Sequence, residues 1–160
     1  MPSLDPAEIL VRAKSVLDSL RLSALWTPSL RDGTLDTSVT FVTFLYDTSG
    51  APPTLPNYAI ATIRRPDGIS ARFAFNSENG QFLEAEGIQK QGTPLPGYVA
   101  TDAAQAAFSA PLPTPEIVWR PCRESSTRFA PFWRYMIGGA YRYVRADGRI
   151  YDYLNTKTRG

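Results

Sequence analysis

The chain has 160 residues, of which 43% are hydrophobic and 12% aromatic, so it can bury one core as a single domain, 1–160. It has no histidine and one cysteine, which excludes catalytic pairs that need histidine, cysteine zinc clusters and an internal disulfide. The net charge is only +2, yet residues 117–160 hold nine Lys/Arg and three Asp/Glu, so basic character gathers toward the C-terminus.

The first predicted element is a helix over residues 6–22. Asp5 is a good N-cap, Pro6 suits the first helical position and Glu8 completes a capping box. Apolar residues then recur at helical spacing, which predicts one stripe that packs on a sheet. The residues of this stripe are Ile9, Leu10, Ala13, Val16, Leu17 and Leu20.

An antiparallel meander is predicted next. Residues 24–38 have a loop composition, and 38–48 are rich in the β-branched and aromatic residues of strands. Strands over 58–65, 69–75 and 81–88 are joined by RPDG and SENG, which both fit a type I turn followed by a left-handed glycine, the three-residue hairpin with a bulge. Counting outward from the turns predicts these cross-strand neighbours: Arg65–Ile69, Ile63–Ala71, Ala61–Phe73, Phe75–Leu83 and Arg72–Glu86.

The C-terminal half repeats this pattern of strands joined by turns that contain glycine. A short helix is expected over 103–110, a strand over 116–120 and a loop over 121–131. Gly138-Gly139 and the RADG turn at 145–148 then predict two linked hairpins. Their expected neighbours are Ile137–Ala140, Tyr135–Arg142, Trp133–Val144, Val144–Ile150, Tyr143–Tyr151, Arg142–Asp152 and Tyr141–Tyr153.

Side chains alternate across such a sheet and give it two faces. The predicted core face holds Trp133, Tyr135, Ile137, Val144, Ile150 and Leu154, with Arg142 paired to Asp152. The other, which we call the Tyr/Arg face, holds the candidate binding residues Arg134, Tyr141, Tyr143, Tyr151 and Tyr153, together with Met136. A helix covers only one face of such a sheet, so this second face is open, covered by a loop or used for binding.

Tyrosine and arginine are enriched at binding hot spots. The same residues also stabilise a sheet through ring pairs and cation–π contacts, so a purely structural role for the Tyr/Arg face is the alternative.

The predicted fold class is α+β, with an N-terminal helix on a curved antiparallel meander sheet. The halves 5–90 and 98–156 echo each other as helix-plus-hairpin units. The stretches YAIATIRRPDGISARFAFNSENGQFLEAEG and FWRYMIGGAYRYVRADGRIYDYL resemble cystatin-like folds and small PepSY-type domains. The second stretch also resembles the tail of uncharacterised bacterial proteins with a W-x-P-C-x-E-S…FWR…YVR-x-DG-x-Y pattern.

The residues whose side chains could take part in catalysis are better interpreted as structural. Cys122 lies between two arginines, which can activate a thiol, but without histidine a buried, incidental cysteine is favoured. Glu124 and Ser125 fit a turn that bonds its own backbone better than a polar pocket. No residue is therefore predicted to be catalytic or to bind a metal or cofactor.

The sequence favours a non-enzymatic binding or regulatory module that recognises a protein segment through the Tyr/Arg face. Alternatives are a small-ligand or enzymatic pocket between helix and sheet, and single-stranded nucleic-acid binding, which the scarcity of lysine disfavours. A homodimer through a sheet edge is also compatible. Because no apolar run approaches the ~20 residues of a membrane span and no secretory signal is evident, we expect a cytoplasmic protein without membrane contact.

Overall fold

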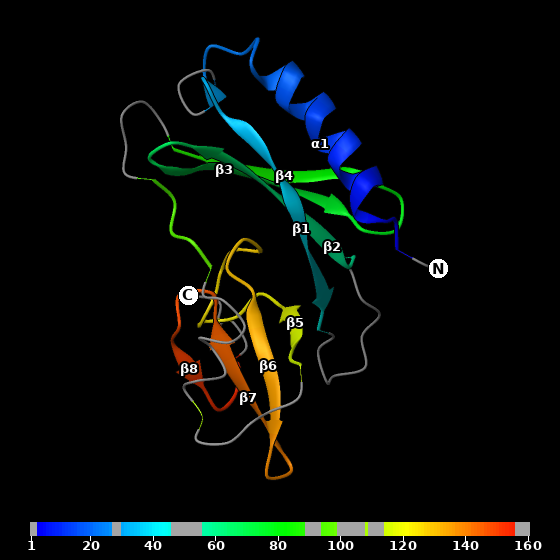
Figure 1. Cartoon of the computed structure of the whole chain (residues 1–160). Coiled ribbons are helices and arrows are strands. Elements are labelled where there is room, and N and C mark those ends of the chain that lie inside the picture. Colours follow the sequence, from blue (N-terminus) through cyan, green and yellow to red (C-terminus); the bar gives the residue numbers. More distant parts are fainter. Residues whose placement is uncertain are drawn as a thin grey trace. The chain divides into compact units, whose positions relative to one another are not determined.

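The computed structural model describes residues 3–26, 30–45, 56–88, 94–98, 108 and 114–155. In these residues the chain forms one N-terminal helix and eight strands, and the registered strand pairs are antiparallel except one, so the α+β prediction is confirmed (Figure 1). The elements in chain order are α1 (Pro6–Leu20), β1 (Thr34–Phe44), β2 (Tyr58–Arg65), β3 (Gly68–Asn76), β4 (Phe82–Gly87), β5 (Glu116–Trp119), β6 (Phe132–Ile137), β7 (Ala140–Arg145) and β8 (Ile150–Tyr151).

The chain divides into two compact units. Unit 1 comprises Met1–Phe41 and Pro56–Pro96, and unit 2 comprises Val42–Leu55 and Gly97–Gly160. Within unit 1 the strands follow the hydrogen-bonding order β4-β3-β2-β1. Within unit 2 the order β5-β6-β7-β8 is joined by the last residues of β1, which pair in parallel with β5.

Helix α1 begins as predicted. Asp5 and Glu8 form the capping box, each side chain accepting a hydrogen bond of 2.9 Å from the other's backbone N–H. The helix ends at Leu20 rather than at residue 22, because Arg21 forms its C-cap and donates its guanidinium to the carbonyls of Leu30 and Gly33. Among the described residues, no helix has the length and apolar character that crossing a bilayer requires.

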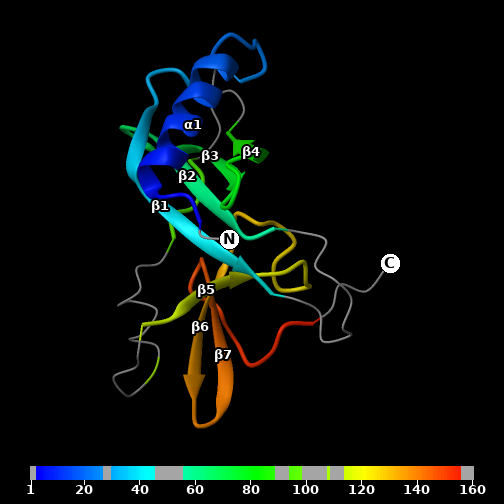
Figure 2. The ribbon, with the colours of Figure 1, turned by 90° about the vertical axis from the view of Figure 1, so that its right-hand side faces the viewer.

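The core of unit 1 lies between α1 and the sheet, and Figure 2 shows the helix running along one side of it. Alanines opposite phenylalanines leave room for the helix, since Ala61 pairs with Phe73 and Phe73 pairs with Ala85. The fully buried members of this core are Ile9, Ala13, Leu17, Leu30, Ala59, Ala61, Ile63, Ala71, Phe73 and Phe75.

Strand β1 starts earlier than predicted. Residues 34–37 were expected to be loop, but they are extended and the Asp36 carboxylate accepts a 2.7 Å hydrogen bond from Arg64 Nε. Because of this ion pair, the polar residues 34–37 can form the exposed start of a strand. The predicted strand 38–48 ends at Phe44, and its residues after Leu45 lie outside the described ones.

A bulge is predicted at the glycine of each turn, but the two bulges of the meander lie farther from the turns, between Ile63 and Arg64 and between Ala74 and Phe75. The expected neighbours Ile63–Ala71, Ala61–Phe73 and Arg72–Glu86 are confirmed. The other two predictions were wrong, because Arg65 pairs with Gly68 rather than Ile69, and Phe75 pairs with Phe82 rather than Leu83. Each difference follows from a bulge, which adds one residue to one strand and shifts every neighbour on the turn side of it.

The hairpin of unit 2 has the predicted register. Ile137–Ala140, Tyr135–Arg142 and Trp133–Val144 are paired, and Gly138 and Gly139 have φ of 58° and 82°, as a tight two-residue turn requires. Strand β8 pairs Ile150 with Val144 and Tyr151 with Tyr143, as predicted. It ends there, so Asp152 and Tyr153 do not enter the ladder, although Asp152 forms an ion pair with Arg142.

The predicted core face of this sheet is largely confirmed. Trp133, Tyr135, Val144 and Ala146 form a buried cluster, against which Tyr98, Phe108 and Ile137 pack. Leu154 is buried as well, but Ile150 is 43% exposed because it lies in a two-residue strand at the edge of the sheet that the described residues form. The predicted helix 103–110 lies outside the described residues except for Phe108.

Candidate functional site

Arg134 and Tyr141 meet on the Tyr/Arg face. Arg134 pairs across the hairpin with Tyr143, and Met136 pairs with Tyr141, so these four side chains project from the same face of β6 and β7. The guanidinium carbon of Arg134 lies 4.1 Å from the centre of the Tyr141 ring, in a cation–π contact. The rings of Tyr141 and Tyr143 are 6.4 Å apart.

The Tyr/Arg face is not uniformly open. Phe132 lies on it and is fully buried, and its ring has edge contacts with Tyr143 at 6.1 Å and with Tyr151 at 6.2 Å. The end near the glycine turn is exposed, with Met136 at 47% and Tyr141 at 41%. Two predicted binding residues, Tyr143 and Tyr151, therefore help to cover buried Phe132. Tyr153 is exposed but follows the end of β8, outside the ladder.

Glu116 belongs to the site although the sequence did not single it out. Strand β5 pairs Glu116 with Arg134, and its Oε2 accepts hydrogen bonds from Arg134 Nε, at 2.8 Å, and from Nη2. Burial lowers the pKa of Arg134, but the bonds to Glu116 outweigh it and raise that pKa above its usual value. The two residues are 18 positions apart in the sequence, and no local motif predicts their pairing.

A hollow of about 260 Å³ lies at the exposed end of the face. It is smaller than the ~300–1,000 Å³ of typical small-molecule pockets. Its mixed lining offers an aromatic ring, a thioether, a hydroxyl and an ion pair. The lining residues are Thr114, Glu116, Arg134, Tyr135, Met136 and Tyr141.

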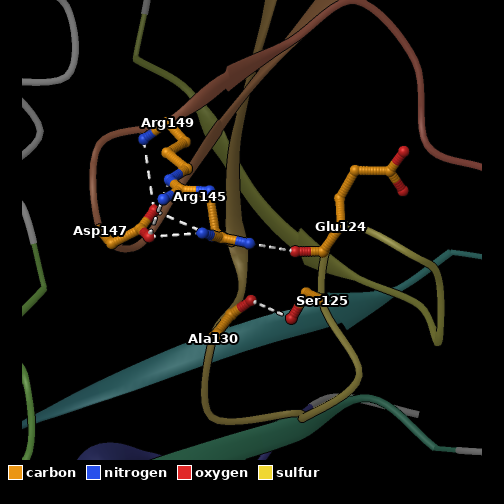
Figure 3. A network of polar contacts seen from close by, with 6 residues as sticks. All are labelled: Glu124, Ser125, Ala130, Arg145, Asp147 and Arg149. Carbon is orange, nitrogen blue, oxygen red and sulfur yellow. Dashed lines mark hydrogen bonds and ion pairs between the residues drawn. The ribbon is translucent and has the colours of Figure 1, made fainter.

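A second polar network lies around the RADG turn (Figure 3). Arg145 donates from Nε to Asp147 at 2.9 Å and from Nη1 to the backbone carbonyl of Glu124 at 2.5 Å. The hydrogen bond from Arg145 lowers the pKa of Asp147 to about 2. Asp147 also accepts a hydrogen bond from the backbone N–H of Arg149, so its carboxylate stabilises the turn.

The Glu124 carboxylate bonds its own backbone, as predicted, and it also holds a distant segment, which was not predicted. It accepts 2.9 and 2.6 Å hydrogen bonds from the backbone and side chain of Asn155. Burial raises the pKa of Glu124, but the bonds from Asn155 outweigh it and lower that pKa. Ser125 does bond its own loop as predicted: its hydroxyl donates to the Ala130 carbonyl at 2.7 Å (Figure 3), and the Thr127 carbonyl lies 3.1 Å from the same oxygen.

Cys122 is buried beside this network. Its side chain is almost inaccessible, and its Sγ lies 3.6 Å from the Ser125 carbonyl oxygen. Burial raises the pKa of the thiol, and the nearby Glu124 carboxylate raises it further. The two arginines that flank Cys122 in sequence therefore do not activate it.

No group of three carboxylate or thiol side chains that could hold a metal ion occurs in the part of the chain that the structure describes. Comparison with family models, with curated proteins and with solved structures found no match.

Proposed function

We propose that unit 2 is a non-enzymatic binding module that recognises an extended protein segment at the exposed end of its Tyr/Arg face. The hollow beside Tyr141 and Met136 is the observation that carries this proposal. Both side chains are large, apolar over most of their surface and more than 40% exposed, and they flank a fixed arginine. Aromatic, methionine and arginine side chains are enriched where proteins bind one another.

The ionisable groups support binding better than acid–base chemistry. A general acid or base works best with a pKa near the ambient pH. Burial moves the pKa of the Cys122 thiol upward, whereas hydrogen bonds move the pKa values of Glu124 and Asp147 downward. All three shifts move the pKa values farther from neutral pH. The size of the hollow supports a single side chain as occupant, rather than a whole small-molecule substrate.

The test is a selection of random displayed peptides on the immobilised whole chain, followed by binding measurements with the recovered peptides. The double variant Met136→Ser, Tyr141→Ser removes the apolar walls of the hollow. We expect it to weaken binding at least about tenfold, since loss of a hot-spot side chain costs more than about 1–2 kcal/mol. The melting temperature should fall only by a few degrees, because both side chains are exposed and the cation–π contact of Tyr141 with Arg134 contributes about 0.5–1 kcal/mol at such a site.

The matched control is Val11→Ser, Leu22→Ser. These two apolar side chains are also exposed, at 70% and 89%, but belong to unit 1. Binding that survives the first double variant, or falls equally in both, would contradict the proposal and leave the Tyr/Arg face with a structural role. The cystatin-like resemblance and the homodimer through a sheet edge stay predictions.

A further inference from the structure

Arg134 is held as a fixed, mostly buried cation in the lining of the hollow. The Tyr141 ring lies against its guanidinium at 4.1 Å and Glu116 accepts from its Nε and Nη2. The arginine side chain is only 16% exposed. A guanidinium held in this way has a preset orientation for a carboxylate, which is the anion that its planar fork fits best.

Glu116 is a replaceable partner of this cation. Its side chain is 62% exposed, and the hydrogen bonds from Nε and Nη2 of Arg134 both go to the same oxygen, Oε2. Because Glu116 is mostly exposed, its carboxylate gains little free energy from the pair over a hydrated carboxylate, whereas the mostly buried Arg134 stays paired when one carboxylate replaces another. Another carboxylate that arrives at the hollow can therefore take the place of Glu116 at small cost.

The net positive charge around the hollow favours the binding of an acidic segment. Residues 114–155 contain seven arginines and four acidic residues. Glu116, Asp147 and Asp152 are each paired with an arginine, and Glu124 is bonded to Asn155. The excess of three positive charges attracts anionic segments and raises their rate of encounter.

From this geometry we infer that the segment recognised by unit 2 is acidic, and that Glu116 occupies the position of the partner's carboxylate in the free protein. The inference rests on the proposed function and names the chemistry of its partner. An aspartate or glutamate of the segment bonds Arg134 and displaces Glu116. An apolar side chain two residues away, on the same side of an extended chain, enters the hollow between Met136 and Tyr141.

The probe is a fluorescein-labelled synthetic copy of the peptide recovered most often in the selection, with a second copy in which every Asp and Glu is replaced by Asn and Gln. We expect the recovered peptides to carry net negative charge and the neutral copy to bind more weakly. Glu116→Gln removes the competitor, so it should strengthen binding of the acidic peptide about 2- to 5-fold. That gain should shrink as salt is added.

Asp152→Asn is the matched control. It changes the net charge by the same amount and frees Arg142, an arginine 45% exposed on the opposite face of β7. Equal gains from the two variants would overturn displacement at Arg134, because a general increase in positive charge would then explain both. Hollow-dependent peptides that are neutral or basic would overturn the inference and leave the proposed function standing. Failure to recover any hollow-dependent peptide would overturn both.

Discussion

Arg134 contacts Tyr141 through the ring face and Glu116 through hydrogen bonds, so one side chain links β5, β6 and β7 of unit 2. This double contact predicts a stability effect that can be measured without any partner. Arg134→Ala removes a cation–π contact and an ion pair in which only Glu116 is mostly exposed, and we expect the free energy of unfolding to fall by about 1–2 kcal/mol.

Chemical denaturation of Arg134→Ala measures this loss. Arg142→Ala is the comparison, because Arg142 is 45% exposed and its partner Asp152 is 66% exposed. We expect Arg142→Ala to stay within about 0.5 kcal/mol of the parent chain. A loss of the same size in both variants would mean that the Tyr141 contact contributes nothing.

The low pKa of Asp147 predicts how the RADG turn responds to acid. Its pKa is about 2 in the folded chain and 3.8 ordinarily, so its contribution to stability is complete above pH 3.8 and disappears as the pH falls through about 2. Arg145→Gln should return the pKa of Asp147 toward 3.8, as followed by NMR titration of its carboxyl carbon. Arg149→Gln should change it less, because Arg149 Nε lies 3.9 Å away.

Cys122 should be chemically silent in the folded chain. Its burial and raised pKa leave little accessible thiolate, which is the form that reacts with aromatic disulfide reagents. We expect no reaction under native conditions and complete reaction in guanidinium chloride. An exposed position in the same loop provides the control, since Ser126→Cys in a Cys122→Ala chain should react at once. Rapid native reaction of Cys122 would contradict the buried site.

The glycine turn between β6 and β7 predicts a backbone effect. Gly139 has φ of 82°, and a methyl group added to its Cα would meet no atom within 4 Å, so Gly139→Ala isolates the cost of the left-handed conformation. We expect a loss of about 1–2 kcal/mol in thermal unfolding. Gly97 has equally open surroundings without that φ, and Gly97→Ala should leave stability unchanged or raise it by up to about 1 kcal/mol.

Hairpin geometry explains why the sequence predicted much of unit 2. A tight turn fixes the register of its strands, so placing Gly138-Gly139 also placed Trp133 opposite Val144, and placing the RADG turn placed Tyr143 opposite Tyr151. The bulges in β2–β3 and β3–β4 were predicted at the turn glycines, and their actual positions in the ladders have no such signal, because any residue can occupy the extra position. Those two registers therefore failed on the turn side of each bulge.

Contacts between segments that are distant in the sequence were the other feature that the sequence did not predict. Glu116 reaches Arg134 only because β5 lies beside β6, and Glu124 reaches Asn155 across 31 positions. Alternation assigned Arg134, Met136 and Tyr141 to one face correctly. Alternation cannot tell which end of a face is covered, so the burial of Phe132 beneath Tyr143 and Tyr151 was not predicted.

The ring that lies over Arg134 affects how association would divide between enthalpy and entropy. A free arginine side chain loses considerable rotamer entropy when a partner immobilises it. For Arg134 most of that loss already belongs to folding, because Tyr141 and Glu116 restrict its torsions beforehand. Calorimetry would then show a smaller entropic penalty for the parent chain than for Tyr141→Leu, in which the guanidinium regains its freedom.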